Sequence, residues 1–154
     1  MNMKNITPNL WFDGNAEEAV EFYISVFPNS KVISTVYYPK SAEEGLAPFQ
    51  LNMAGKVLTI DFELMGNRFV AINAGPKFKF NESVSFSIPC EDQKEIDYYY
   101  EKLSAVPASE VCGWCKDKYG LSWQVVPKNM EELMKRPHAF AKLMKMRKIV
   151  IEDF

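Results

Sequence analysis

The chain has 154 residues, of which 47% are hydrophobic and 14% aromatic, enough material for the core of one compact domain. Its formal charge is −2, and the basic residues are scattered apart from a modest cluster from Lys142 to Lys148, so we expect no nucleic-acid partner. No apolar run approaches the roughly 20 residues that cross a bilayer, and the first residues lack the apolar stretch of a signal peptide. We therefore expect a cytoplasmic protein with no membrane partner.

The first half of the chain alternates like a strand and then takes on helical spacing. Leu10 and Phe12 share one side of a strand predicted over residues 6–12, and Asp13-Gly14-Asn15 supplies a turn and a helix N-cap. Apolar residues on one helical face predict a helix over 16–27. Runs of β-branched and aromatic residues predict further strands over 32–38, 57–64 and 68–73. The connection 39–55 is long for a compact domain, and such loops often border a site.

The sequence resembles itself at an offset of 76 positions. Val20-Glu21-Phe22-Tyr23 then lies over Ile96-Asp97-Tyr98-Tyr99, and Leu10 meets Phe86. This predicts a duplicated strand-helix unit, with a chance likeness between two amphipathic segments as the alternative. In the second half we expect a helix over 92–104, strands over 110–112 and 121–126 flanking a turn at 116–120, and tail helices over 131–135 and 137–146.

Four segments carry a resemblance to a known family, and the resemblance extends over essentially the whole chain. They are residues 6–23 (ITPNLWFDGNAEEAVEFY), 69–76 (FVAINAGP), 78–86 (FKFNESVSF) and 112–127 (CGWCKDKYGLSWQVVP). These segments resemble the PhnB-like, 3-demethylubiquinone-methyltransferase-like domains of the glyoxalase/vicinal-oxygen-chelate superfamily. Several long segments in the same order make the resemblance specific.

The resemblance implies an α+β fold in which two pseudo-repeated βαβββ-type modules form a curved mixed sheet around a cleft. We expect one domain over 1–154, with module one at about 1–76, module two at about 77–127 and a helical tail at 128–154. The resemblance also implies a homodimer. It does not imply methyl transfer, because the chain has no glycine-rich loop after a strand that would cradle a nucleoside cofactor.

The metal chemistry of the superfamily needs His or Glu on the first and last strand of each module. By the resemblance these slots fall near Pro8, Asn73, Val84 or Ser85, and Gln124, none of which is His, Cys or a carboxylate. The single histidine, His138, lies in the tail, so we predict no metal and no cofactor. Asp61 and Glu63 share one face of a strand and are the alternative ligands, although such pairs more often lie on a solvated sheet face.

The three cysteines are odd in number and predict reduced thiols rather than a disulfide framework. Cys112-Gly113-Trp114-Cys115 has the spacing of a thioredoxin-type pair and of half a zinc ribbon. A thioredoxin pair needs a following helix N-terminus, and a zinc ribbon needs a second pair that Cys90 cannot supply. We therefore interpret Cys115 as a packed hydrophobic residue and keep Cys112 as a candidate reactive thiol; nothing in the sequence places His138 beside it as a base.

Aromatic and amide side chains on inward strand positions suit a small organic ligand, because aromatic walls bury apolar area while amides fix orientation. Trp123 and Gln124 cannot face the same side of one strand, and the slot correspondence favours Gln124. The alternative for each aromatic residue is core packing. The predicted ligand-pocket residues are Trp11, Phe62, Asn73, Phe86, Cys112, Trp114 and Gln124.

We expect a small-molecule binding protein of the PhnB-like branch that lacks the usual metal site. The rival is a metal-dependent enzyme of the lyase or dioxygenase type with non-standard ligands, which bound stoichiometric metal would favour. A third interpretation, an interaction module in the tail, requires an exposed apolar stripe at Leu143, Met144 and Met146; we expect the tail instead to dock on its own domain or on the dimer mate.

Overall fold

A computed structural model describes residues 4–154 and divides the chain into two compact units. Unit 1 ends at Lys79, and unit 2 runs from Phe80 to Phe154. The expected module boundary after residue 76 lies close to this division. That the two units make up a single domain stays a prediction.

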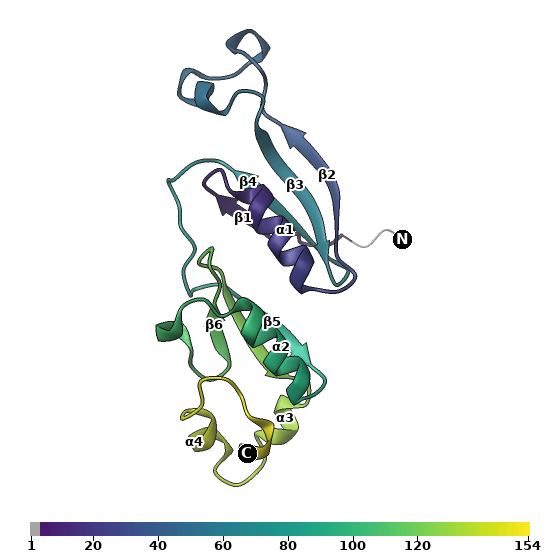
Figure 1. Cartoon of the computed structure of the whole chain (residues 1–154), viewed down its shortest axis with the longest axis vertical. Helices are drawn as coiled ribbons and strands as arrows, with labels where there is room; N and C mark the ends of the chain where they lie inside the picture. The colour runs from purple at the N-terminus through teal and green to yellow at the C-terminus, as the bar shows by residue number, and fades with distance from the viewer. Residues whose placement is uncertain (1–3) are drawn as a thin grey trace. The chain divides into compact units, whose positions relative to one another are not determined.

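Unit 1 is a four-stranded mixed sheet with one helix on it (Figure 1). The strands lie in the order β1-β4-β3-β2; β1 is parallel to β4, and β3 is antiparallel to both of its neighbours. Two 3-10 turns interrupt the long connection between β2 and β3. The elements are β1 (Asn9–Phe12), α1 (Ala16–Val26), β2 (Lys31–Tyr37), η1 (Ala42–Glu44), η2 (Pro48–Met53), β3 (Val57–Leu64) and β4 (Asn67–Asn73).

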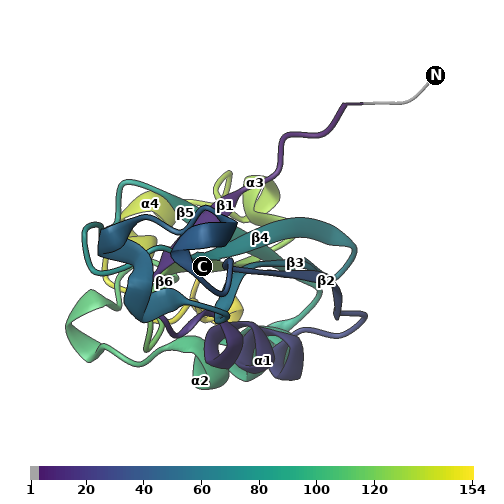
Figure 2. The same cartoon turned by 90° about the horizontal axis from the view of Figure 1, so that it is seen from above.

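Helix α1 covers one face of this sheet, as both views show (Figures 1 and 2). Its apolar side, which includes Ala19 and Tyr23, is fully buried against side chains that alternate along β3 and β4. Alternation is what a half-buried antiparallel sheet requires, because successive side chains point to opposite faces. The helix-side residues of the sheet are Leu10, Phe12, Ile60, Phe62, Leu64, Phe69, Ala71 and Asn73. The opposite side is called the open face below.

Unit 2 repeats the arrangement with one strand fewer. Its strands lie in the order β5-β7-β6, with β5 parallel and β6 antiparallel to β7. The elements are β5 (Ser85–Cys90), α2 (Gln93–Leu103), η3 (Pro107–Ser109), β6 (Trp114–Lys116), β7 (Ser122–Pro127), α3 (Met130–Leu133), α4 (Ala139–Leu143) and η4 (Ile151–Asp153). The predicted fold class is confirmed, and the mixed sheet of each unit carries its helix in the same place along the chain.

The strand predicted over 110–112 is wrong. Val111 forms only an isolated bridge with Trp114, and the chain turns between them because Cys112 and Gly113 have left-handed backbone, with φ of 51° and 89°. A side chain at Gly113 would also collide with its surroundings, since a Cβ there would lie 2.8 Å from Cδ1 of Ile149. The strand therefore begins at Trp114.

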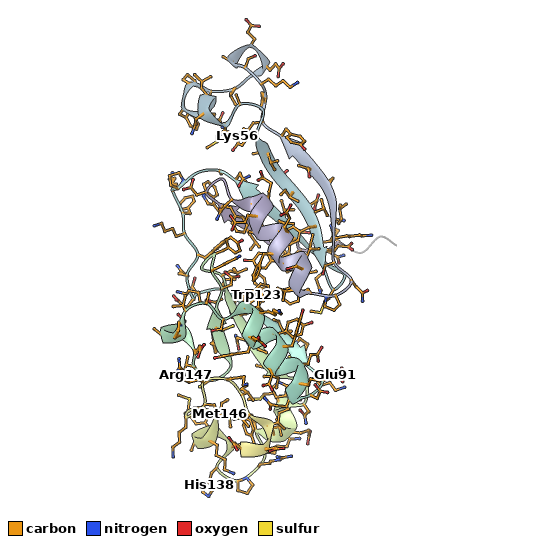
Figure 3. All side chains as sticks on the ribbon, viewed as in Figure 1. Lys56, Glu91, Trp123, His138, Met146 and Arg147 are labelled. Carbon is orange, nitrogen blue, oxygen red and sulfur yellow. The ribbon has the colours of Figure 1, made fainter. Side chains whose placement is uncertain are left out.

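The C-terminal tail docks on unit 2 at the turn before β6. The N–H groups of Cys112 and Gly113 donate to the carbonyls of Met146 and Arg147, each at 2.8 Å, while the carbonyl of Gly113 accepts from Val125 of β7 at 2.9 Å. Figure 3 labels Met146 and Arg147 in this segment. The tail thus holds the turn that leads into β6. Its two helices are shorter than predicted. At the outer edge of β6 itself, the N–H of Ala105 donates to the carbonyl of Lys116 at 2.8 Å.

Candidate functional site

The two faces of each sheet sort the predicted pocket residues into separate groups. Trp11, Trp114 and Gln124 lie on open faces, because their strand neighbours are the buried helix-side residues. Phe62, Asn73 and Phe86 point to the helix side, where Phe62 stacks on Phe69 with ring centroids 5.6 Å apart. Cys112 lies in the turn before β6.

The open face of unit 2 joins an indole to a fixed amide. Trp114 and Gln124 are direct cross-strand neighbours on β6 and β7. The Nε2 of Gln124 donates to Oγ of Ser85 at 2.9 Å, which holds the amide in place and leaves its Oε1 turned to other donors. Lys116, on the same face, forms an ion pair with Glu82. This face therefore offers an aromatic surface, an acceptor and hydroxyl groups to a ligand.

The open face of unit 1 holds Trp11 in a fixed orientation. Its Nε1 donates to the carbonyl of Gly75 at 2.8 Å, and its ring meets the edge of Phe78 with centroids 4.8 Å apart. Asp61 also lies here and pairs with Arg68 at 3.0 Å. Arg68 thus partly neutralises the carboxylate of Asp61. The indole of Trp11 is the large flat surface on this face that an apolar ligand can contact.

Asn73 and Gln124 were predicted as equivalent slots, but the structure places them on opposite faces. Phe12 pairs with Asn73, and its repeat counterpart Ile88 pairs with Val125. Gln124 therefore corresponds to Ile72, one residue away, and in a strand one residue reverses the direction of the side chain. The amide of Asn73 points to α1, where it accepts from the N–H of Ala16 at 3.0 Å.

Asn73 nevertheless lines a cavity, of about 420 Å³, in unit 1. The sequence singled out no other residue of this cavity, although it did indicate that the 39–55 connection borders a site. Residues of that connection form part of the wall. The cavity is lined by Asp13, Gly14, Glu17, Tyr37, Tyr38, Asn52, Met53, Gly55, Lys56, Val57, Asn73 and Gly75.

No group of three or more His, Cys, Asp or Glu side chains that could hold a metal ion occurs within residues 4–154. His138 lies at the start of α4 with left-handed backbone, away from the sheets in Figure 3. The absence of a metal in the living protein stays a prediction. No helix of the described chain is long and apolar enough to cross a membrane.

The three cysteines are unpaired and differ in burial. Cys115 is buried on the helix side of β6, as the sequence predicted for a packed residue, and burial raises the pKa of its thiol to about 12. Burial raises the pKa of Cys90 to about 12 as well. Cys112 is half-buried, with its Sγ 3.8 Å from Sδ of Met144.

We expect one of the three thiols to react quickly with a disulfide reagent in the native protein at pH 8. Cys90 and Cys115 stay protonated and enclosed at that pH, because only the thiolate attacks and their pKa values lie near 12. Thiol counting with Ellman's reagent before and after adding denaturant checks this. A Cys112→Ser variant should lose the fast reaction; fast labelling of all three thiols would show that the core opens readily.

The sequence profile of the 3-demethylubiquinone-9 3-methyltransferase family matches residues 4–126. The Bacillus cereus PhnB protein, described in the same words, is 34% identical over 80% of this chain and 99% of its own, with a TM-score of 0.62. A Pseudomonas aeruginosa protein is 17% identical over 82% of this chain and 98% of its own, with a TM-score of 0.60. The fosfomycin resistance protein FosX of Listeria monocytogenes is 12% identical over 88% and 100%, with a TM-score of 0.52, and shares the fold alone. The curated proteins contain no match.

Proposed function

Since this chain belongs to the 3-demethylubiquinone-9 3-methyltransferase family, in the PhnB-like branch with the glyoxalase/vicinal-oxygen-chelate fold, we propose that it binds a small organic molecule without acting on it chemically. The name of the family is that of an enzyme. Our proposal departs from it because methyl transfer needs a cradle for a nucleoside cofactor, and the turn between β1 and α1, Asp13-Gly14-Asn15, has a single glycine.

The observation that carries the proposal is the pairing of Trp114 with Gln124 on the open face of unit 2. An indole supplies a large rigid apolar surface, and an amide supplies one acceptor and two donors without the desolvation cost of a buried charge. Because Ser85 already holds the amide, little conformational entropy is lost when a ligand binds. Trp11 gives unit 1 a comparable platform on its own open face.

The second candidate function is a metal-dependent enzyme of the lyase or dioxygenase type. Asp61 and Glu63, both on the open face of unit 1, are its ligands in that case. The ion pair between Asp61 and Arg68 weighs against it, since Arg68 would compete with the metal for the carboxylate.

A homodimer is part of the proposal. Strand β2 is an edge strand, and it exposes Val32, Ile33, Val36 and Tyr37. An exposed apolar edge favours pairing with another chain unless something covers it. A second copy is the partner that the family resemblance predicts for this surface.

The test is native mass spectrometry of untagged purified protein together with elemental analysis of the same sample. We expect a dimer that retains an organic mass and no stoichiometric divalent metal. Trp114→Ala and Gln124→Ala should each lower the retained fraction, by about tenfold for the indole, because stacking and a fixed hydrogen bond contribute roughly 1–2 kcal/mol each.

Phe140→Ala is the matched control, because Phe140 is an aromatic residue of unit 2 that is 67% exposed in α4. It should leave retention unchanged. Stoichiometric metal that a chelator removes would favour the enzyme instead. Retention that survives both open-face substitutions would place the ligand elsewhere.

A further inference from the structure

The cavity of unit 1 has the dimensions of a small-molecule site. Its volume of about 420 Å³ falls within the range of roughly 300–1,000 Å³ typical of ligand pockets. Four segments enclose it: the start of α1, the end of β2, the connection that leads into β3, and the end of β4. Figure 3 labels Lys56 where that connection rejoins the sheet.

Opposite charges line this cavity without neutralising one another. Asp13 and Glu17 bring carboxylates from the β1–α1 turn and the first turn of α1, and Lys56 brings an ammonium group from the other wall. Within residues 4–154, neither Asp13 nor Lys56 forms an ion pair, so the ammonium nitrogen lies more than 4.0 Å from the carboxylate oxygens. A ligand with both charges can occupy the space between them.

The inner wall of the cavity is held by hydrogen bonds. Asn73 Nδ2 donates to Oε1 of Glu17 at 2.8 Å, which fixes the carboxylate in the first turn of α1. The hydroxyl of Tyr38 donates to the carbonyl of Asn73 at 2.5 Å, and burial raises the pKa of Tyr38, so this ring stays neutral. Tyr37, which is 60% exposed, also lines the cavity. Rings beside carboxylates favour an organic cation at that end.

We propose that this cavity binds a small zwitterion of the amino-acid type. Its ammonium group lies at Asp13 and Glu17, its anionic group at Lys56, and its side chain against Tyr37 and Tyr38. The open-face site has neither an unpaired cation nor an unpaired carboxylate at its centre, so the two sites take ligands of different chemistry, and this inference stands apart from the proposed function.

Three probes of nearly equal size test the contribution of each ligand charge: L-phenylalanine carries both charges, 2-phenylethylamine only the ammonium group, and 3-phenylpropionate only the carboxylate. Titration followed by ¹H–¹⁵N NMR should show L-phenylalanine binding at least about tenfold more tightly than either singly charged compound, because each lost charge pair removes roughly 1.4 kcal/mol. The shifted signals should cluster at residues 13–17, 37–38 and 52–57 in unit 1.

Two substitutions predict opposite patterns. Lys56→Met should lower the affinity for L-phenylalanine to that of 2-phenylethylamine and leave 2-phenylethylamine unchanged. Asp13→Asn should weaken both amines and leave 3-phenylpropionate unchanged. Glu21→Gln on the exposed side of α1 and Lys94→Met on α2 are the charge-matched controls, and neither should alter any affinity. Equal binding of the three probes, binding of none, or shifts confined to the open faces would overturn the proposal.

Discussion

Replacing Asp117 by alanine is expected to lower the free energy of unfolding by about 4 kcal/mol, the largest effect of any single substitution considered for unit 2. Asp117 is 1% exposed. Its Oδ1 accepts from the backbone N–H groups of Tyr119 and Leu121 at 2.8 and 3.1 Å, and its Oδ2 accepts from Nε1 of Trp123 at 2.8 Å. Alanine leaves all three donors without this acceptor, and urea unfolding followed by tryptophan fluorescence measures the loss.

Asp117→Asn distinguishes the contribution of the two backbone hydrogen bonds from that of the hydrogen bond to the Trp123 indole. Asparagine keeps one oxygen for the two backbone donors and presents an NH₂ group to the indole N–H, so we expect a loss between that of alanine and zero. Asp153→Ala in η4 is the control, because Asp153 is an exposed acidic residue of the same unit. A loss below about 1 kcal/mol for Asp117→Ala would mean that water takes over the acceptor role.

The sequence contains the signals for most of unit 1, because its elements follow local patterns. Alternation at Leu10 and Phe12 and the helical spacing of Ala19 and Tyr23 depend only on which face is buried, and the structure confirms both. The resemblance supplied the fold class, whereas the order of the strands was not predicted.

Unit 2 was harder to predict because the turn that leads into β6 is held by residues far along the chain. The hydrogen bonds of Cys112 and Gly113 reach Met146 and Arg147, and no local pattern links these two segments. The left-handed backbone at Cys112 ended the predicted strand for a related reason: a cysteine gives no signal for such a conformation, which is stabilised here by the docked tail.

The candidate site also combines features that local sequence patterns predict with features that depend on residues far apart in the chain. Strand parity shows that Trp123 and Gln124 face opposite sides, and the family resemblance, not parity, favoured Gln124. The resemblance put Asn73 and Gln124 at equivalent slots, but the strand pairings show that the two residues differ by one position in register. The cavity of unit 1 could not be predicted, since Asp13 and Lys56 are far apart in sequence and line one cavity only in the folded unit.

Replacing Asn73 by alanine is expected to lower the free energy of unfolding of unit 1 by about 3 kcal/mol, because this amide on β4 caps the N-terminus of α1. Its Oδ1 accepts from the N–H of Ala16, the first residue of α1, and its Nδ2 donates to Glu17 and to the carbonyl of Val57 at 2.8 and 3.1 Å. Alanine leaves the Ala16 N–H buried without a partner, and equilibrium unfolding with hydrogen exchange in the first turn of α1 measures the effect.

Asn15 provides the comparison for this prediction, because it occupies the N-cap position that a sequence pattern would select. Its side chain makes no capping hydrogen bond. A conventional N-cap substitution costs about 1 kcal/mol, so the pattern predicts that Asn15→Ala weakens α1, whereas the structure predicts almost no change for Asn15→Ala and a large one for Asn73→Ala. The reverse order would show that α1 is capped by its own N-terminal residue and that the amide of Asn73 is not its cap.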